Sequence, residues 1–153
     1  MKKIFIYYSL SGNGDIIANY LKTKKIDIRR VKPVKELPKN NILRILSGGF
    51  LAGINHKDEL IDFDNNISDY DEIIIGSPIW NGKLSCPINT VLDKINLKDK
   101  RIVFILYSGS GNASKEEKIL RSKYNNIKVI SLKEPKVNDF KEVLSREVLW
   151  KRK

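Results

Sequence analysis

The sequence KIFIYYSLSGNG, residues 3–14, decides the fold of this chain. Its first half is a short apolar run with the length and the aliphatic and aromatic content of a buried strand. Its second half is a turn of serine, glycine and asparagine that leads into an amphipathic helical pattern. Such a turn points several backbone N–H groups at one place, where the helix dipole reinforces them. The segment therefore predicts a strand, an anion-binding turn and a helix, in that order.

A second loop of the same kind follows a second apolar run. The sequence IIIGSPIWNG, residues 73–82, places Trp80 in a loop with Pro78, Asn81 and Gly82. An indole in an exposed loop offers a flat ligand ring a surface for stacking. A phosphate at the first loop and a ring at the second describe a bound nucleotide or flavin. The structural alternatives are a plain tight turn at the first loop and a core tryptophan at the second.

The net charge of +11 over 153 residues is distributed unevenly. Residues 1–53 carry eleven Lys or Arg against three Asp or Glu (+8), residues 54–100 carry five against nine (−4), and residues 101–153 carry thirteen against six (+7). The basic segments indicate either lysine-covered helix faces that keep the protein soluble or a surface that steers an acidic partner. A binding site for nucleic acid is not predicted, because no basic run alternates with aromatic residues.

The apolar runs are too short to cross a membrane, and no signal peptide is recognised, so no membrane partner and a cytoplasmic location are expected. The single cysteine cannot form an internal disulfide, which suits the same compartment. Cys86 and the lone His56 are interpreted as packing and surface residues. No Cys/His cluster has the spacing of metal ligands, so no metal site is predicted.

Strands and helices alternate along the rest of the chain. The expected strands are residues 3–8, 26–31, 72–76, 102–107 and 127–132, and the expected helices are 15–24, 87–95, 114–124 and 137–150. A short helix or turn at residues 42–50 is expected to cover one face of the sheet with its apolar side chains. This alternation predicts a parallel sheet with helices on both faces, in one domain spanning residues 1–153. In such a sheet the ligand lies beyond the carboxyl ends of the strands, where the strand order reverses.

The chain resembles the flavodoxins at both loops. The matching segments are Ile6-Tyr7-Tyr8-Ser9-Leu10-Ser11-Gly12-Asn13, with Ala18 in the helix that follows, and residues 70–80 around the second loop. The resemblance implies a three-layer, doubly wound, five-stranded parallel sheet of order 2-1-3-4-5. It also implies that FMN is bound where the first and third strands are neighbours.

The resemblance assigns the cofactor-binding residues position by position. Ser9, Ser11, Gly12 and Asn13 would bind the FMN phosphate, Trp80 would stack on the isoalloxazine ring, and residues 108–111 would lie along its pyrimidine side. The full set implied is Ser9, Leu10, Ser11, Gly12, Asn13, Gly14, Ser77, Pro78, Ile79, Trp80, Asn81, Gly82, Ser108, Gly109, Ser110 and Gly111. The chain departs from the family pattern in two places: Gly14 stands where threonine is usual, and the 108–111 loop lacks the aromatic that commonly covers the second face of the flavin.

The resulting functional hypothesis is an FMN-binding carrier of single electrons. No acid–base pair, triad or activated cysteine stands out, so no catalytic residue is predicted and a carrier is favoured over an enzyme. The alternatives are a small NAD(P)H-dependent FMN or quinone reductase and an interaction module of the same fold that has lost FMN. The expected partner is a redox protein, and an acidic one if the basic surface steers it. Familiar flavodoxins are acidic, so the basic charge of this chain is a further departure from the family. The expected oligomeric state is a monomer or a weak dimer.

Overall fold

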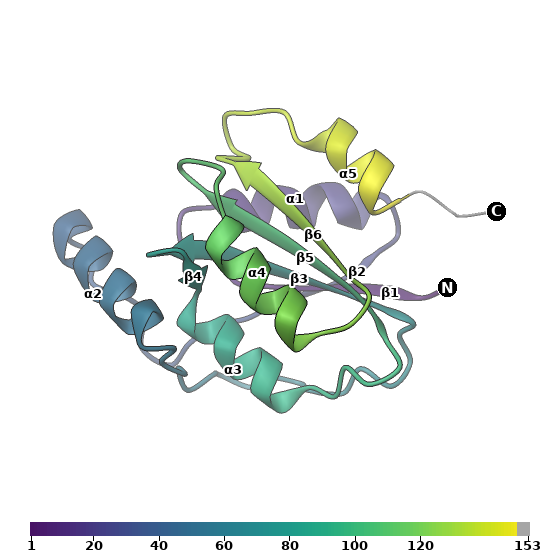
Figure 1. The fold of residues 1–153 in the computed structure, drawn as a ribbon, viewed down its shortest axis with the longest axis horizontal. Helices are drawn as coiled ribbons and strands as arrows, with labels where there is room; N and C mark the ends of the chain where they lie inside the picture. The colour runs from purple at the N-terminus through teal and green to yellow at the C-terminus, as the bar shows by residue number, and fades with distance from the viewer. Residues whose placement is uncertain (150–153) are drawn as a thin grey trace.

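Five parallel strands form the centre of the computed structural model, which describes residues 1–149 (Figure 1). Their order is β2-β1-β3-β5-β6. Their bounds are β1 Lys3–Tyr7, β2 Asp27–Arg30, β3 Glu72–Trp80, β5 Arg101–Ser108 and β6 Ile127–Lys133. A two-residue strand, β4 Lys83–Leu84, pairs antiparallel with the end of β3. The predicted order 2-1-3-4-5 is confirmed, because β3, β5 and β6 are the third, fourth and fifth parallel strands along the chain.

Helices lie on both faces of this sheet, as the alternation predicted. Their bounds are α1 Asn13–Thr23, α2 Asn41–Gly53, α3 Cys86–Lys94, α4 Ser114–Lys123 and α5 Lys141–Glu147. α3 and α4 cover one face, and α1 and α5 cover the other (Figure 1). The Tyr20 hydroxyl of α1 lies 2.7 Å from the Ser145 hydroxyl of α5, so these two helices are direct neighbours.

The strands are buried on both faces because their side chains alternate between two cores. Ile4 and Ile6 of β1 belong to the core under α3 and α4, whereas Phe5 and Tyr7 belong to the core under α1 and α5. β3 divides in the same way at residues 73–75. This explains why the strands read as continuous apolar runs rather than as an alternation of apolar and polar residues.

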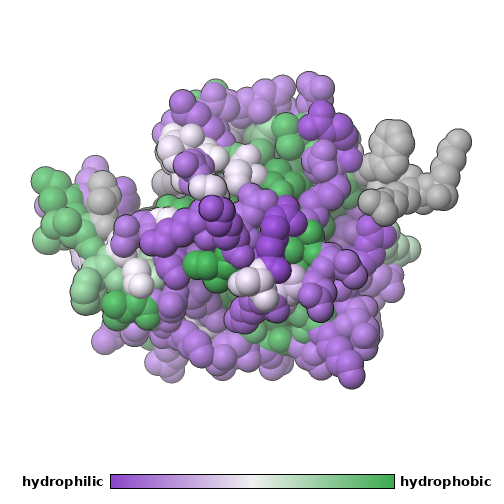
Figure 2. Space-filling model, in the orientation of Figure 1, coloured by the Kyte–Doolittle hydropathy of each residue, from purple (hydrophilic) through white to green (hydrophobic). Residues whose placement is uncertain are grey.

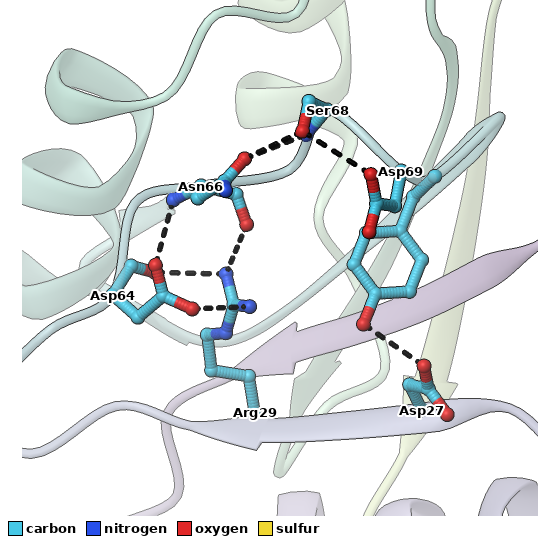
Figure 3. Close-up of polar contacts among 7 residues, drawn as sticks. Asp27, Arg29, Asp64, Asn66, Ser68 and Asp69 are labelled. Carbon is cyan, nitrogen blue, oxygen red and sulfur yellow. Dashed lines mark hydrogen bonds and ion pairs between the residues drawn. The ribbon is translucent and has the colours of Figure 1, made fainter.

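The acidic connection between α2 and β3 covers the outer edge of β2. Near its start, the Val34 amide donates to the Glu59 carbonyl at 2.8 Å. Further on, Arg29 of β2 pairs with the Asp64 carboxylate at 2.8 Å and donates to the Asp64 and Asn66 carbonyls, as Figure 3 shows. The Tyr70 hydroxyl donates to Asp27 at 2.9 Å. These contacts occupy a strand edge that would otherwise be open to pairing with another chain.

α2 departs from the prediction in both length and orientation. It runs unbroken through Gly48 and Gly49 and begins where the Asn40 side chain accepts hydrogen bonds from the first-turn amides. The prediction that its apolar residues cover the sheet is wrong: Ile42 and Phe50 are 70% and 67% exposed. The helix projects from one end of the sheet (Figure 1) and turns its small residues inward, with Ala52 fully buried. Apolar content predicted an amphipathic helix but not which face would find a neighbour.

Two other predicted boundaries change. β3 was expected to end at Gly76 but continues to Trp80, and Asn81 and Gly82 form a two-residue turn into β4. Both turn residues have positive φ, 50° and 71°, as a type I′ hairpin requires. The last helix was expected over residues 137–150 but begins at Lys141, because residues 134–139 form turns. Trp150, the predicted end of that helix, lies outside the described residues.

Candidate functional site

A cavity of about 330 Å³ lies at the carboxyl ends of β1 and β3, where the strand order reverses. Its lining residues come from the first predicted loop, the second predicted loop and α2: Leu10, Ser11, Arg44, Gly49, Ile79, Trp80 and Asn81. The structure thus brings the two glycine-bearing loops together at one cavity. Sequence reasoning named five of the seven residues and missed the two from α2.

The first loop is shaped by Ser9. This side chain is buried, and its hydroxyl oxygen accepts hydrogen bonds from the amides of Gly12 at 3.2 Å and Gly14 at 3.1 Å. Gly12 is the N-cap of α1 with φ +94°, a conformation that glycine adopts without steric cost. Because the N-cap residue is glycine, it brings no side-chain oxygen to the first turn of the helix. Ser9 therefore holds the loop together, while the exposed Ser11 faces the cavity.

Gly14 is explained by packing rather than by ligand contact. It is buried in the first turn of α1, and a Cβ built on it would lie 2.5 Å from the Tyr107 hydroxyl oxygen and 2.8 Å from Tyr7 Cδ2. The Tyr107 hydroxyl donates to the Tyr8 carbonyl beneath the loop. Threonine, which the family pattern has here, does not fit beside these two rings. Tyr107 itself points into the core and is not available to cover a flavin face.

Lys136 joins the first loop from the far end of the chain. Its backbone amide donates to the Asn13 side-chain oxygen at 3.0 Å, and its ammonium group donates to the Ser11 carbonyl at 2.9 Å. The loop after β6 therefore folds back over the N-terminus of α1 and brings a positive charge to it. A phosphate at this place would meet both the helix dipole and this lysine.

An ion pair lies beside the same loop. Arg30 of β2 pairs with Asp15 at 2.9 Å and donates to the Ser9 carbonyl at 3.2 Å. Asp15 also accepts a hydrogen bond from the Tyr7 hydroxyl at 2.9 Å. Burial, followed by the neighbouring Asp15 carboxylate, raises the pKa of Tyr7, so the ring stays neutral. Arg30 offsets the one acidic side chain in the first turn of α1, so the turn remains suited to an anion.

Trp80 lies half-buried between β1 and α2. Its indole meets the Tyr8 ring edge-on, with centroids 5.8 Å apart and an interplanar angle of 88°. A Cβ on Gly48 would come within 3.5 Å of the indole, so α2 packs closely against it. One flank of the indole lines the cavity. The sequence left open whether Trp80 is a core residue or a ligand-facing one. In the structure it contributes both to the packing and to the cavity wall.

Ser77 is a hydrogen-bonding residue inside the hairpin. It is fully buried, and its hydroxyl oxygen accepts from the Ser85 amide at 3.0 Å and lies 3.0 Å from the Ser85 hydroxyl. These bonds tie the carboxyl end of β3 to the start of α3. The structure places Ser77 away from the cavity wall, with Pro78 partly exposed and Ile79 lining the cavity beyond it.

The third predicted loop, residues 108–111, closes on itself. The Ser108 hydroxyl oxygen accepts from the Gly111 amide at 3.0 Å, and the Ser110 oxygen accepts from the Asn112 amide at 3.1 Å. Gly111 has φ +74°, and a Cβ there would lie 2.8 Å from Lys133 Cβ. Residues 108–111 do not line the cavity formed by the first two loops.

Cys86 and His56 occupy the buried and exposed positions that the sequence indicated for them. Cys86 is buried, and burial raises the pKa of its thiol to about 11, so the group is a neutral packing residue at neutral pH. His56 is exposed and lies 3.4 Å from an Asp58 oxygen. Within residues 1–149 no group of three His, Cys, Asp or Glu side chains is placed to hold a metal ion. None of the helices in that range has both the length and the apolar character needed to cross a membrane.

Sequence reasoning missed Arg44, Gly49 and Lys136. Lys136 follows the last strand, and all loops that follow parallel strands meet at one edge of the sheet. Its position near the first loop could therefore have been predicted in general terms. Arg44 and Gly49 lacked any such signal, because they depend on how α2 is oriented. Their contribution is visible only once the helix is seen to stand beside Trp80.

The sheet order and the cavity at its reversal point define a doubly wound α/β protein of the flavodoxin type. The family model described as Flavodoxin matches residues 2–149, and the chain belongs to the flavodoxin family. A candidate flavoprotein from Bacteroides eggerthii has a similar structure, with 22% identity, a TM-score of 0.76, and 98% of this chain and 99% of that one covered.

A second structural neighbour is a flavoprotein in complex with FMN from Lactobacillus acidophilus. It shares 24% identity with this chain, with a TM-score of 0.63 over 84% of this chain and 89% of that one. A search of curated proteins gave no match. At these identities the structural likeness supports the shared fold.

Proposed function

We propose that this chain binds FMN at the cavity between β1 and β3 and carries single electrons to a partner protein. One observation carries the proposal: the loop that leads into the glycine-capped N-terminus of α1, and whose Ser11 carbonyl accepts from Lys136, lines the same cavity as the indole of Trp80. Bound FMN would supply the redox chemistry, and the protein would bind it, orient it and restrict its contact with water.

The residues present fit this cofactor in two parts. Ser11, the first-turn amides of α1 and Lys136 would hold the phosphate through charge-assisted hydrogen bonds, each worth about 1.5–3 kcal/mol. Trp80 would contact the ring from the opposite wall of the cavity. The FMN complex of the Lactobacillus acidophilus neighbour supports the same cofactor for this fold.

Titration of the purified protein with FMN and with riboflavin tests the phosphate assignment. FMN should bind at least about tenfold more tightly for every charge-assisted bond that its phosphate gains. Ser11→Ala should weaken FMN but leave riboflavin unchanged, whereas Trp80→Leu should weaken both. Ser122→Ala, at the far end of α4, is the matched control for the first substitution. Equal affinities for FMN and riboflavin in the unaltered protein would refute the assignment.

The electron-carrier role has its own test. The FMN-loaded protein should oxidise NADH or NADPH only slowly and should accept electrons from a protein donor. Steady NAD(P)H oxidation would refute the carrier role and establish the reductase alternative. Failure to bind any flavin would favour an interaction module.

A further inference from the structure

The surface around the cavity combines positive charge with exposed apolar side chains. We call it the carboxyl-edge surface and define it as residues 9–14, 77–83 and 108–113 together with α2. None of these four segments contains Asp or Glu, and they include Arg44 and Lys83. At the amino ends of the strands, by contrast, charges of both signs pair with each other, as Lys3 and Glu72 do at 2.8 Å.

Two further lysines lie against this surface from neighbouring elements. Lys115 of α4 is exposed, and a Cβ on Gly82 would lie 3.2 Å from its Cδ. Lys136 lies over the first loop through its bond to Ser11. Lys83 reaches Asn55, just beyond the end of α2, at 3.5 Å. The cavity is therefore bordered by cations contributed by α2, β4, α4 and the loop after β6.

Two acids, the buried Glu116 and the exposed Glu134, lie beside the four cations of this border. Glu116 is buried near Lys83. Burial raises the pKa of its carboxyl group by more than the positive charge of Lys83 lowers it. Glu134 lies in the loop that carries Lys136. An anionic partner approaching the cavity would thus meet more positive than negative side chains.

The apolar part of the surface is one row of side chains on α2. Ile42, Leu46, Phe50 and Ile54 follow each other at intervals of four residues and are 58–70% exposed. In Figure 2 the apolar colour covers much of the projecting part of the molecule, which Figure 1 labels as α2. An apolar centre with a charged rim is the usual composition of a protein–protein interface. A second copy of the chain is disfavoured as the partner, because it would bring the same cations face to face.

We propose that the carboxyl-edge surface is the docking site for an acidic redox protein, with the α2 row at its apolar centre and the lysines at its rim. This inference rests on the proposed function, because it assumes that electrons leave through the cavity. It places the steering charges there rather than among the basic residues in or just after α1 and in α5, namely Lys22, Lys24, Lys25, Lys141 and Arg146.

An anion-mapping experiment tests the location without any flavin. Hexacyanochromate(III), a paramagnetic trianion that exchanges its ligands slowly, is added to the FMN-free protein, and broadening of backbone amide signals is recorded by NMR. Amides of residues 11–14, 81–84 and 114–116 should broaden first. Preferential broadening at residues 22–25 and 141–146 would overturn the proposal, and neither result depends on whether FMN binds.

A kinetic experiment tests the steering. The FMN-loaded protein is reduced with dithionite and mixed with ferricyanide, each molecule of which takes one electron and becomes ferrocyanide. The rate should fall as salt is added. At low ionic strength Lys115→Glu should slow it about threefold or more, because a change of two charges acts on a trianion within about one Debye length. Lys141→Glu makes the same change in the first turn of α5 and should have a much smaller effect. Equal effects of the two substitutions would overturn the proposal.

A third measurement tests the α2 row with a small acidic [2Fe–2S] protein as the electron donor. Leu46→Ser combined with Phe50→Ser should slow electron transfer from this donor about tenfold while leaving the ferricyanide reaction unchanged. An unchanged rate with the acidic protein would remove α2 from the docking site. Failure of the unaltered protein to bind FMN would instead count against the proposed function, so the two failures are distinguishable.

Discussion

Replacement of Gly14 by alanine should destabilise the fold through a contact with Tyr107. The new Cβ would lie 2.5 Å from the Tyr107 hydroxyl oxygen, 2.8 Å from Tyr7 Cδ2 and 3.0 Å from Ser9 Cβ. Tyr107 cannot move aside easily, because it is buried and its hydroxyl donates to the Tyr8 carbonyl. Overpacking of this kind costs about 1–3 kcal/mol, and alanine recovers up to about 1 kcal/mol of helix propensity, so we expect a net loss of up to about 2 kcal/mol.

A double-mutant cycle isolates the contact. Tyr107→Phe alone should cost about 1 kcal/mol, because it removes the hydrogen bond to the Tyr8 carbonyl. It also removes the atom that lies nearest to the new Cβ, so Gly14→Ala should cost about 1 kcal/mol less in the Tyr107→Phe background. The free energies of unfolding are measured by urea denaturation followed by circular dichroism.

Gly109→Ala is the matched control for this cycle, because a Cβ at Gly109 would meet no atom within 4 Å. It should change the free energy of unfolding by less than about 0.5 kcal/mol. Additive effects of Gly14→Ala and Tyr107→Phe would refute the explanation that the tyrosine excludes a larger residue at position 14.

Four further substitutions test other parts of the structure. Gly82→Ala should cost about 1 kcal/mol in urea denaturation, because φ is +71° in the hairpin turn; no loss would contradict the type I′ geometry. Burial raises the pKa of Glu116, so its ionisation opposes folding and stability should fall as pH rises from the ordinary glutamate pKa through the raised value. Glu116→Gln should flatten that part of the stability profile, and an unaltered profile would assign it to other groups. Phe50→Ala should change stability by less than about 0.5 kcal/mol, whereas Phe104→Ala in the core should cost about 3–5 kcal/mol; similar losses would mean that α2 is packed differently.

The sequence predicted those features that depend on local pattern. The apolar runs at residues 4–6 and 73–75 are readable because parallel strands are buried on both faces, and the glycine-bearing loops mark their carboxyl ends. The face of the sheet on which Tyr107 lies could also have been predicted, because alternate residues of a strand share a face. Tyr107 shares a face with Ile105, in the core under α1, so it could not cover a flavin.

Features that depend on tertiary packing were not predictable from the sequence. The apolar residues of α2 indicated an amphipathic helix, but only the structure shows Gly48 against Trp80 and Phe50 in solvent. Lys136 reaches Ser11 across 125 positions of the chain, through a loop with no regular structure. The extension of β3 to Trp80 depends on the Asn81-Gly82 turn, which reads equally well as an exposed loop.

The sparse attachment of α2 has a consequence for how the molecule opens. The contacts of the helix include those of Gly48, the buried Ala52 and the Gly49 carbonyl with Asn81, while Ile42, Leu43, Leu46 and Phe50 are exposed and contribute little buried area. Its backbone amides should therefore exchange with solvent deuterium through a local opening whose free energy is far below that of global unfolding. The amides of β1 and β3 should not exchange in this way. Because Arg44 and Gly49 form one wall of the cavity, each such opening would also open the cavity. Detachment of α2 would then be a route for ligand entry, and a bound ligand should slow deuterium uptake along residues 41–53.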